Sequence, residues 1–212
     1  LSSETWEIIR KLRGDEIELQ IAFQCAPLIT GLKESNLLNI KKQDYQRMKD
    51  IFKESELTIY PLGIHAGKIT VFLYHRERLE KFLSGESVLA LLHEIGYIDT
   101  DLKQVLPVFR AHYQQYLREK KVFPHEMGLL LGYPPEDVKG FIRNQGKNYL
   151  YSGYWKVYDR PHEKIRLFKK YEHSREKLIQ LLSYGMRIEE IIAICSNTEI
   201  WQLVDCDCQY AS

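Results

Sequence analysis

The sequence LTIYPLGIHAGKITVFLY, residues 57–74, decides the fold. It holds two runs, 57–62 and 68–74, that are rich in β-branched and aromatic residues. The loop that joins them contains Gly63 and Gly67, as the turn of a β-hairpin requires. The stretch therefore predicts two adjacent strands connected by a short loop.

Helical patterns surround this hairpin on both sides. The clearest begins at Thr100, a good N-cap, and carries a continuous apolar stripe that ends at Leu117 and must face the core. Glycines follow several of the shorter helical patterns as natural stops. Helices are predicted over residues 2–12, 44–54, 76–83, 87–95, 102–117, 124–131, 135–144, 162–182 and 188–195.

Two further segments predict strands. Apolar residues alternate at the start of the segment from Ile17 to Ile29, where Pro27 and Gly31 then turn the strand into a special loop. The segment from Tyr149 to Val157 alternates in the same way, and Gly153 indicates a bulge. A few strands among many helices, without regular βαβ alternation, predict an α+β fold in which a small mixed or antiparallel sheet packs against many helices.

The composition is that of a globular protein. The chain has 212 residues, of which 44% are hydrophobic and 28% are charged, so it can bury a core. We expect a single α+β domain over residues 1–212, with 196–212 as a loosely ordered tail. The formal net charge of +1 supplies no field toward nucleic-acid phosphates or anionic membranes.

Several signals bear on the compartment. No run approaches the roughly 18 apolar residues of a membrane span, and the acidic start lacks the features of a signal peptide. Four cysteines in a chain of this length do not form the dense disulfide framework of a small secreted domain. The sequence predicts a cytoplasmic protein with reduced thiols and no membrane contact.

A long motif carries a family resemblance. Residues 123–142 read FPHEMGLLLGYPPEDVKGFI, and Gly146-Lys147, residues 153–158 (GYWKVY), Ala26-Pro27 and residues 31–33 (GLK) extend the likeness. The chain resembles a bacterial domain-of-unknown-function family, found mainly in anaerobic Gram-positive bacteria. The resemblance covers residues 24 to 184 and implies a shared fold and a bacterial cytoplasm, but the family brings no established activity.

The chain also departs from this family's pattern. The residues Tyr74-His75-Arg76 stand where the family has Tyr-Arg-Pro. Tyr149 and Tyr151 stand where cysteines often occur, which counts against a metal role in that strand.

His125 and Glu126 form the most suggestive pair of side chains. An imidazole beside a carboxylate can act as a general base or a metal ligand. The zinc motif with a second histidine four positions later is excluded, because position 129 is Leu. The alternative is structural: His125 closes a local hydrogen bond, and Glu126 complements the helix dipole.

Other candidates each have a plain alternative. Cys25 is a nucleophile if a base lies near it, or a small buried residue. Lys33 and Asn36 after Gly31 could meet a phosphate or carboxylate, or lie in a solvated loop. Cys206-Asp207-Cys208, with Cys195 and His173 as possible companions, resembles half of a metal site. The alternative is a flexible tail with free thiols.

Aromatic residues concentrate between residues 149 and 158. They could stack on a flat ligand such as a flavin or nucleobase, cover a partner surface, or pack in the core. The aromatic residues are Tyr149, Tyr151, Tyr154, Trp155 and Tyr158.

These signals predict a small-molecule or cofactor-binding protein, or a small enzyme, whose substrate and cofactor the sequence does not identify. The pocket is expected where the loop 25–36 meets the turn 125–135 and the aromatic strand. The predicted catalytic residues are His125, Glu126 and Cys25, the predicted ligand-binding residues are Gln24, Lys33, Asn36, Tyr133, Lys147, Tyr154 and Trp155, and no metal ligand is predicted.

Two other classes of function remain. The chain could be a non-catalytic adaptor that binds a partner protein. It could also be a helix-turn-helix regulator, with helices 124–131 and 135–144 as the motif. Nucleic-acid binding is disfavoured, because Glu136 and Asp137 would enter the groove first and repel phosphates.

Overall fold

A three-stranded antiparallel sheet organises the computed structural model, which describes residues 16–120 and 123–197. Its strands are β1 (Ser35–Lys41), β2 (Leu57–His65) and β3 (Lys68–His75), in the spatial order β1–β3–β2. The predicted hairpin is confirmed as β2 and β3. Pro61 lies in the edge strand β2, next to an irregularity in the register, where its missing N–H costs no hydrogen bond to a further strand.

Helices make up most of the remaining structure, and the α+β class is confirmed. In chain order they are α2 (Glu16–Ile29), α3 (Tyr45–Ile51), α4 (Arg76–Leu83), α5 (Glu86–Ile95), α6 (Leu102–Glu119), α7 (Glu126–Leu130), α8 (Pro135–Arg143), α9 (Pro161–Ser183) and α10 (Ile188–Ser196). A short 3-10 turn, Lys42–Asp44, precedes α3, and β4 (Tyr151–Ser152) pairs with β5 (Lys156–Val157). The predicted helix over 2–12 lies outside the described residues.

Both faces of the sheet are buried, and the central strand β3 shows this most clearly. Val71 and Leu73 point into one core cluster, which they share with side chains of α2, α3, α9 and α10. Phe72 and Tyr74 point to the other face, into a cluster built from α4 to α8. Because successive side chains of a strand alternate between faces, one strand supplies both cores.

The segment predicted as a strand over 17–29 is instead the helix α2, so that prediction is wrong. Ile17, Ile21 and Cys25 are spaced by four and lie buried on one face. Apolar residues at spacings of two and four satisfy the strand and the helix pattern alike, and packing against α9 and β1 selects the helix. Gly31, with φ +70°, takes the left-handed conformation that ends it.

Two other segments also differ from expectation. Of the two alternatives for the residues after Gly31, the solvated loop is wrong, because Lys33 and Ser35 are buried and β1 begins at Ser35. The predicted strand from Tyr149 to Val157 is two short strands, β4 and β5, that reverse at Gly153. Local alternation cannot distinguish one long strand from a tight hairpin of the same residues.

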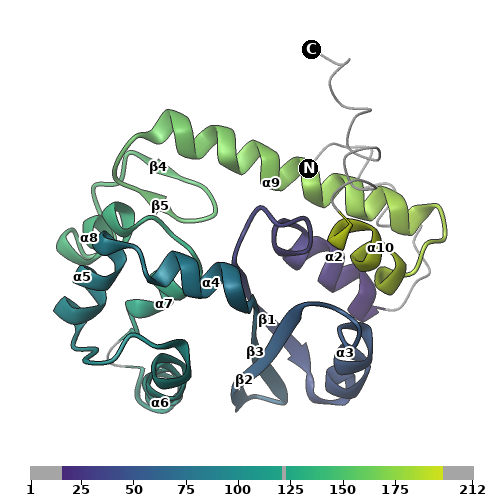
Figure 1. Cartoon of the computed structure of the whole chain (residues 1–212), viewed down its shortest axis with the longest axis horizontal. Coiled ribbons are helices and arrows are strands. Elements are labelled where there is room, and N and C mark those ends of the chain that lie inside the picture. The colour runs from purple at the N-terminus through teal and green to yellow at the C-terminus, as the bar shows by residue number, and fades with distance from the viewer. Residues whose placement is uncertain (1–15, 121–122, 198–212) are drawn as a thin grey trace.

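The long helix α9 packs against both the β4–β5 hairpin and the core cluster around α2. It runs along the top of the view in Figure 1, from the β4–β5 hairpin to α2 and α10. Phe168 and Tyr171 of its first half pack against the hairpin, whereas Leu178 and Leu182 enter the core around α2. None of the helices in the described ranges combines the length and the apolar composition that a bilayer crossing needs.

Because both faces of β3 are buried, shortening a side chain on this strand should destabilise the protein. Replacing Phe72 by alanine should lower the free energy of unfolding by about 3–5 kcal/mol, because its buried ring leaves a cavity between the sheet and α6. Ile64→Ala is the matched control, since this residue of the same sheet is 63% exposed and should change stability by less than about 0.5 kcal/mol. Urea denaturation followed by circular dichroism measures both.

Candidate functional site

The motif of residues 123–142 folds into α7, a turn and α8, and the β4–β5 hairpin packs on α8. Gly140 allows this close approach, because a Cβ atom at that position would lie 2.5 Å from Cβ of Tyr158. The sequence motif therefore marks a packing unit as well as a surface. The site described below lies between the two helices and the hairpin.

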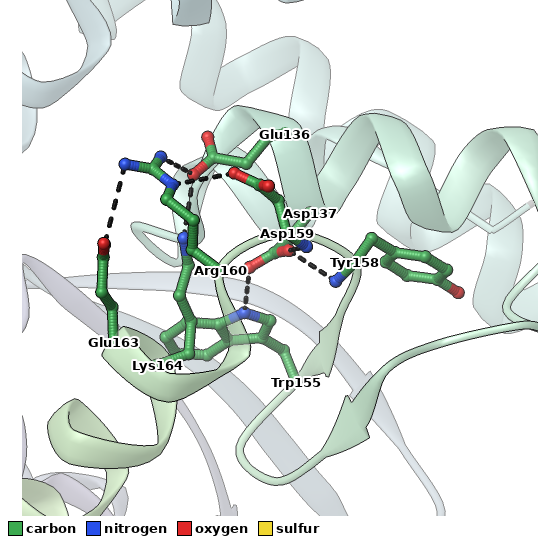
Figure 2. Close-up of polar contacts among 8 residues, drawn as sticks. All are labelled: Glu136, Asp137, Trp155, Tyr158, Asp159, Arg160, Glu163 and Lys164. Atoms are coloured by element: carbon green, nitrogen blue, oxygen red, sulfur yellow. Dashed lines mark hydrogen bonds and ion pairs between the residues drawn. The ribbon is translucent and has the colours of Figure 1, made fainter.

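A single buried carboxylate fixes the hairpin to the first turn of α8. Asp137, only 1% exposed, accepts three hydrogen bonds. Its Oδ2 accepts from the indole Nε1 of Trp155 at 2.8 Å, and its Oδ1 accepts from the backbone N–H groups of Tyr158 and Asp159 at 2.7 and 3.1 Å. Figure 2 shows these bonds converging on the one side chain. The position of Trp155 is thereby set by Asp137.

The neighbouring Glu136 makes a second connection, to the start of α9. Its Oε1 lies 2.8 Å from Arg160 and 2.9 Å from Lys164, as Figure 2 also shows. Burial alone would raise the pKa of the Glu136 carboxyl, but the hydrogen bonds from Lys164 and Arg160 outweigh it and lower the pKa below its usual range. The acidic first turn of α8 is thus occupied by contacts within the chain.

A cavity of about 290 Å³ lies beside this network, and we call it the aromatic cavity. Its walls include Phe123, His125, Tyr133, Phe141, Tyr154 and Trp155, with Lys156 at the edge of the hairpin. The rings of Tyr133 and Trp155 stack at 4.7 Å between centroids. Such walls match the flat faces of aromatic molecules.

His125 is the unusual polar residue of this cavity. Its ring packs against Phe141 at 6.0 Å and Phe123 at 5.9 Å between centroids. Its Nδ1 is buried and has no hydrogen-bond partner among the described residues, so the predicted local hydrogen bond is not formed through this atom. Buried imidazole nitrogens without a hydrogen-bond partner are uncommon in folded proteins.

A second group of predicted residues gathers at the junction of α2 and β1. Asn36 joins it: its Nδ2 donates to the carbonyl of Gln24 at 2.9 Å and lies 3.6 Å from Cys25 Sγ, and its Oδ1 accepts from Lys33 Nζ at 3.3 Å. The same ammonium lies 5.4 Å from the centre of the Tyr133 ring. The loop 25–36 and the turn 125–135 therefore meet at Tyr133, but no residue of the loop lines the aromatic cavity.

Burial controls the chemistry of this group. It raises the pKa of the Cys25 thiol to about 11, and the hydrogen bond from Asn36 and the charge of Lys33 oppose it. It lowers the pKa of Lys33 to about 8, and the nearby Cys25 and Glu34 oppose that shift. Cys25 is fully buried and stays a thiol at neutral pH, whereas a nucleophilic cysteine needs the thiolate. Its environment is that of a buried structural residue.

The remaining predicted residues are dispersed. Lys147 is exposed and does not line the aromatic cavity, and the side chain of Gln24 faces solvent. Cys206 and Cys208 lie outside the described residues, together with any metal site that they would form. Within the described part of the chain, no group of three or more His, Cys, Asp or Glu side chains is placed to hold a metal ion.

Glu126 has a partner that the sequence analysis missed. It does not pair with the adjacent His125; its Oε1 lies 2.7 Å from Nδ1 of His112 and accepts from the hydroxyl of Tyr97 at 3.2 Å. These residues come from α6, α7 and the segment after α5. The one signal in the sequence was a histidine beside the apolar stripe of α6, one position before Tyr113.

A second cavity, of about 490 Å³, opens at this pair, and we call it the His112 cavity. His112 and Glu126 line it, with Glu94, Gln115 and Glu119 among the other polar residues. Phe123 and His125 line both cavities and stand between them.

Comparison with known proteins identifies a family but no activity. The family whose model matches is described as a protein of unknown function, DUF3793, over residues 21–192. The chain belongs to this family, which confirms the resemblance to an uncharacterised family. No curated protein matches the chain. No solved structure matches it either.

The role of Asp137 gives a direct prediction. In Asp137→Asn, one acceptor oxygen becomes an NH₂ group that faces a buried N–H donor, so the free energy of unfolding should fall by about 1–3 kcal/mol. Asp159→Asn is the matched control, because its side chain is 51% exposed and bonds only the exposed Arg160. Thermal unfolding should separate the two variants; equal stabilities would show that the three hydrogen bonds contribute little.

Lys33 gives a prediction about pH. Its pKa in the fold, about 8, lies below the ordinary 10.5, so the unfolded chain binds this proton more tightly. The cost of burying the charge is fully present below pH 8 and declines toward pH 10.5. Lys33→Met should therefore be more stable than the parent at pH 7, by up to about 3 kcal/mol, and the difference should shrink as the pH rises. Urea denaturation at several pH values tests this; a constant difference would contradict it.

Proposed function

We propose that the chain binds a small planar heterocycle in the aromatic cavity. The observation that carries this proposal is the buried Nδ1 of His125, which has no hydrogen-bond partner among the described residues and lies at the wall of a cavity lined by aromatic rings. Buried polar atoms in folded proteins are nearly always paired, so a hydrogen-bonding ligand supplies what the described residues do not. The cavity volume, about 290 Å³, suits a molecule of two or three fused rings.

The polar groups at the cavity narrow the ligand class. Lys156 donates one hydrogen bond, to the carbonyl of Gly146 at 2.6 Å, and an ammonium has three protons to donate. Asp137, by contrast, already accepts three hydrogen bonds and has little capacity left. A neutral or anionic heterocycle rich in acceptor atoms, such as a flavin ring or a nucleobase, is favoured over a cation.

The adaptor hypothesis has one observation in its favour. Three consecutive residues at the start of the β4–β5 hairpin, Tyr149, Leu150 and Tyr151, are 45%, 63% and 39% exposed. Exposed aromatic and aliphatic side chains favour contact with a partner protein. None of these three residues lines the aromatic cavity, so the two proposals do not compete for the same residues.

The helix-turn-helix hypothesis gains no support from the contacts of α8. A recognition helix presents its first residues to the groove, but Asp137 is buried against Trp155, and Glu136 is paired with Arg160 and Lys164. Nucleic-acid binding therefore stays disfavoured. The location we propose is a bacterial cytoplasm, and the buried free thiol of Cys25 is compatible with it.

Fluorescence quenching tests the proposed ligand site. Lumichrome and adenine serve as planar probes, with cyclohexanecarboxamide as a non-planar control, and a Trp155→Phe variant identifies the signal of this residue. Both planar probes should quench Trp155, because they stack beside it, whereas cyclohexanecarboxamide should not. His125→Leu should weaken their binding about tenfold through loss of one hydrogen bond, an effect of about 1.4 kcal/mol.

His162→Leu provides the matched control, because His162 is exposed on α9 and should leave the affinity unchanged. Absence of quenching by either planar probe at millimolar concentration would overturn the proposal. Equal affinity of His125→Leu and the parent for the planar probes would show that the probes bind without the imidazole. The buried Nδ1 of His125 would then no longer support the proposed ligand class.

A further inference from the structure

The pairing of His112 with Glu126 has the geometry of an oriented base. The Glu126 side chain is only 3% exposed, whereas that of His112 is 48% exposed at the rim of the His112 cavity. A carboxylate has no proton to give, so the 2.7 Å contact places the proton on Nδ1 of His112. In this tautomer the free lone pair of the imidazole lies on Nε2, the basic atom in comparable histidine–carboxylate pairs.

The ring of His112 is also held from the side. Tyr97 packs edge-on against it at 6.3 Å between centroids, and the Tyr97 hydroxyl donates to the same carboxylate oxygen. Burial raises the pKa of Tyr97, and the charge of Glu126 and their hydrogen bond raise it further, so the phenol stays a donor. A base held by a buried carboxylate and a packed ring loses little orientation when it reacts.

The charges around the cavity define what can approach this base. Glu94 and Glu119 line it together with Glu126, and only Glu94 has a cationic partner in the described part of the chain, Lys139 at 3.0 Å. Carboxylates at the rim repel phosphate esters and other anions. The cavity is therefore suited to neutral or cationic molecules, whereas the aromatic cavity, with Lys156, is suited to neutral or anionic ones.

We propose that His112 is a general base that activates water for hydrolysis of a neutral or cationic ester in the His112 cavity, with Glu126 as its positioning residue. This activity goes beyond the proposed binding of a heterocycle and uses different side chains.

The reaction balances without any other reactant. His112 Nε2 takes a proton from water while the water oxygen bonds to the carbonyl carbon of the ester. The π electrons of the carbonyl move to its oxygen in this step. When the C=O bond re-forms, the C–O bond to the alcohol breaks, and the imidazolium gives its proton to the leaving oxygen. The products are a carboxylic acid and an alcohol, and the imidazole is regenerated.

Ester hydrolysis by the full chain tests the assignment. The probes are p-nitrophenyl acetate, which is neutral, and 4-acetoxybenzenesulfonate, which is anionic, with free imidazole as the reference for intrinsic reactivity. The ratio of the hydrolysis rate of the neutral ester to that of the anionic ester should be higher for the protein than for free imidazole. His112→Gln should lower kcat/KM for p-nitrophenyl acetate by about 100-fold, the lower range of what a positioned base contributes. His65→Gln, a change of an exposed histidine on β2, should leave it unchanged.

The positioning role of Glu126 is tested by measurements that would not change if Glu126 only packed in the core. Glu126→Gln should lower kcat and leave KM unchanged, and ¹⁵N spectra of the His112 ring should show loss of the single Nδ1–H tautomer. Free imidazole should restore part of the rate to His112→Ala, which leaves space for it, and should not accelerate His65→Ala beyond its own background.

The assignment can also be tested without a variant, by measuring histidine modification rates in the parent protein. Diethyl pyrocarbonate should modify His112 faster than His65 in folded protein, as mass spectrometry of the peptides will show. Equal modification rates, or hydrolysis that persists in His112→Gln, would overturn the proposal. Quenching of Trp155 by lumichrome would be retained in that case, so failure here is distinct from failure of the ligand site.

Discussion

The hydrogen bonds to the Asp137 carboxylate are the interaction on which the rest of the site depends. A short two-stranded hairpin has little stability of its own. It is held in place because one carboxylate accepts the Trp155 indole and two backbone N–H groups at its base. That attachment brings Trp155 against Tyr133, and both rings line the aromatic cavity with His125. A single acidic side chain thus holds the hairpin wall of this cavity against the two helices.

The sequence predicted the elements whose patterns are local and unambiguous. The β2–β3 hairpin has strand-forming runs and glycines between them, and α6 carries a stripe that only helical spacing explains. Helix α2 was missed because Ile17, Ile21 and Cys25 fit two periods at once, and only its contacts with α9 and β1 decide between them. Strand β1 was missed because its asparagines resemble a loop until β3 pairs with them.

The sequence indicated the part of the candidate site that is built from segments close together in the chain. Residues of the motif 123–142 and the nearby Trp155 were singled out in the sequence, and both line the aromatic cavity. The partner of Glu126 was not predictable, because His112 lies on another helix and adjacency in sequence favoured His125. Lys33 was predicted either to bind a ligand or to lie in a solvated loop, whereas it is buried and lies over the ring of Tyr133, one hundred positions away. Contacts of this kind are properties of the packing and leave no local pattern.

Helix α9 has a consequence for how the chain is made. It packs along α2, the first described element, although the two are separated by more than 130 residues of sequence. At 23 residues α9 spans roughly 34 Å, long enough to complete the core around α2 at one end and the hairpin at the other. A chain emerging from the ribosome must therefore carry α2 with an unfilled apolar face until α9 follows. The apolar face of the early segment α2 is therefore fully buried only after the late segment α9 has been synthesised.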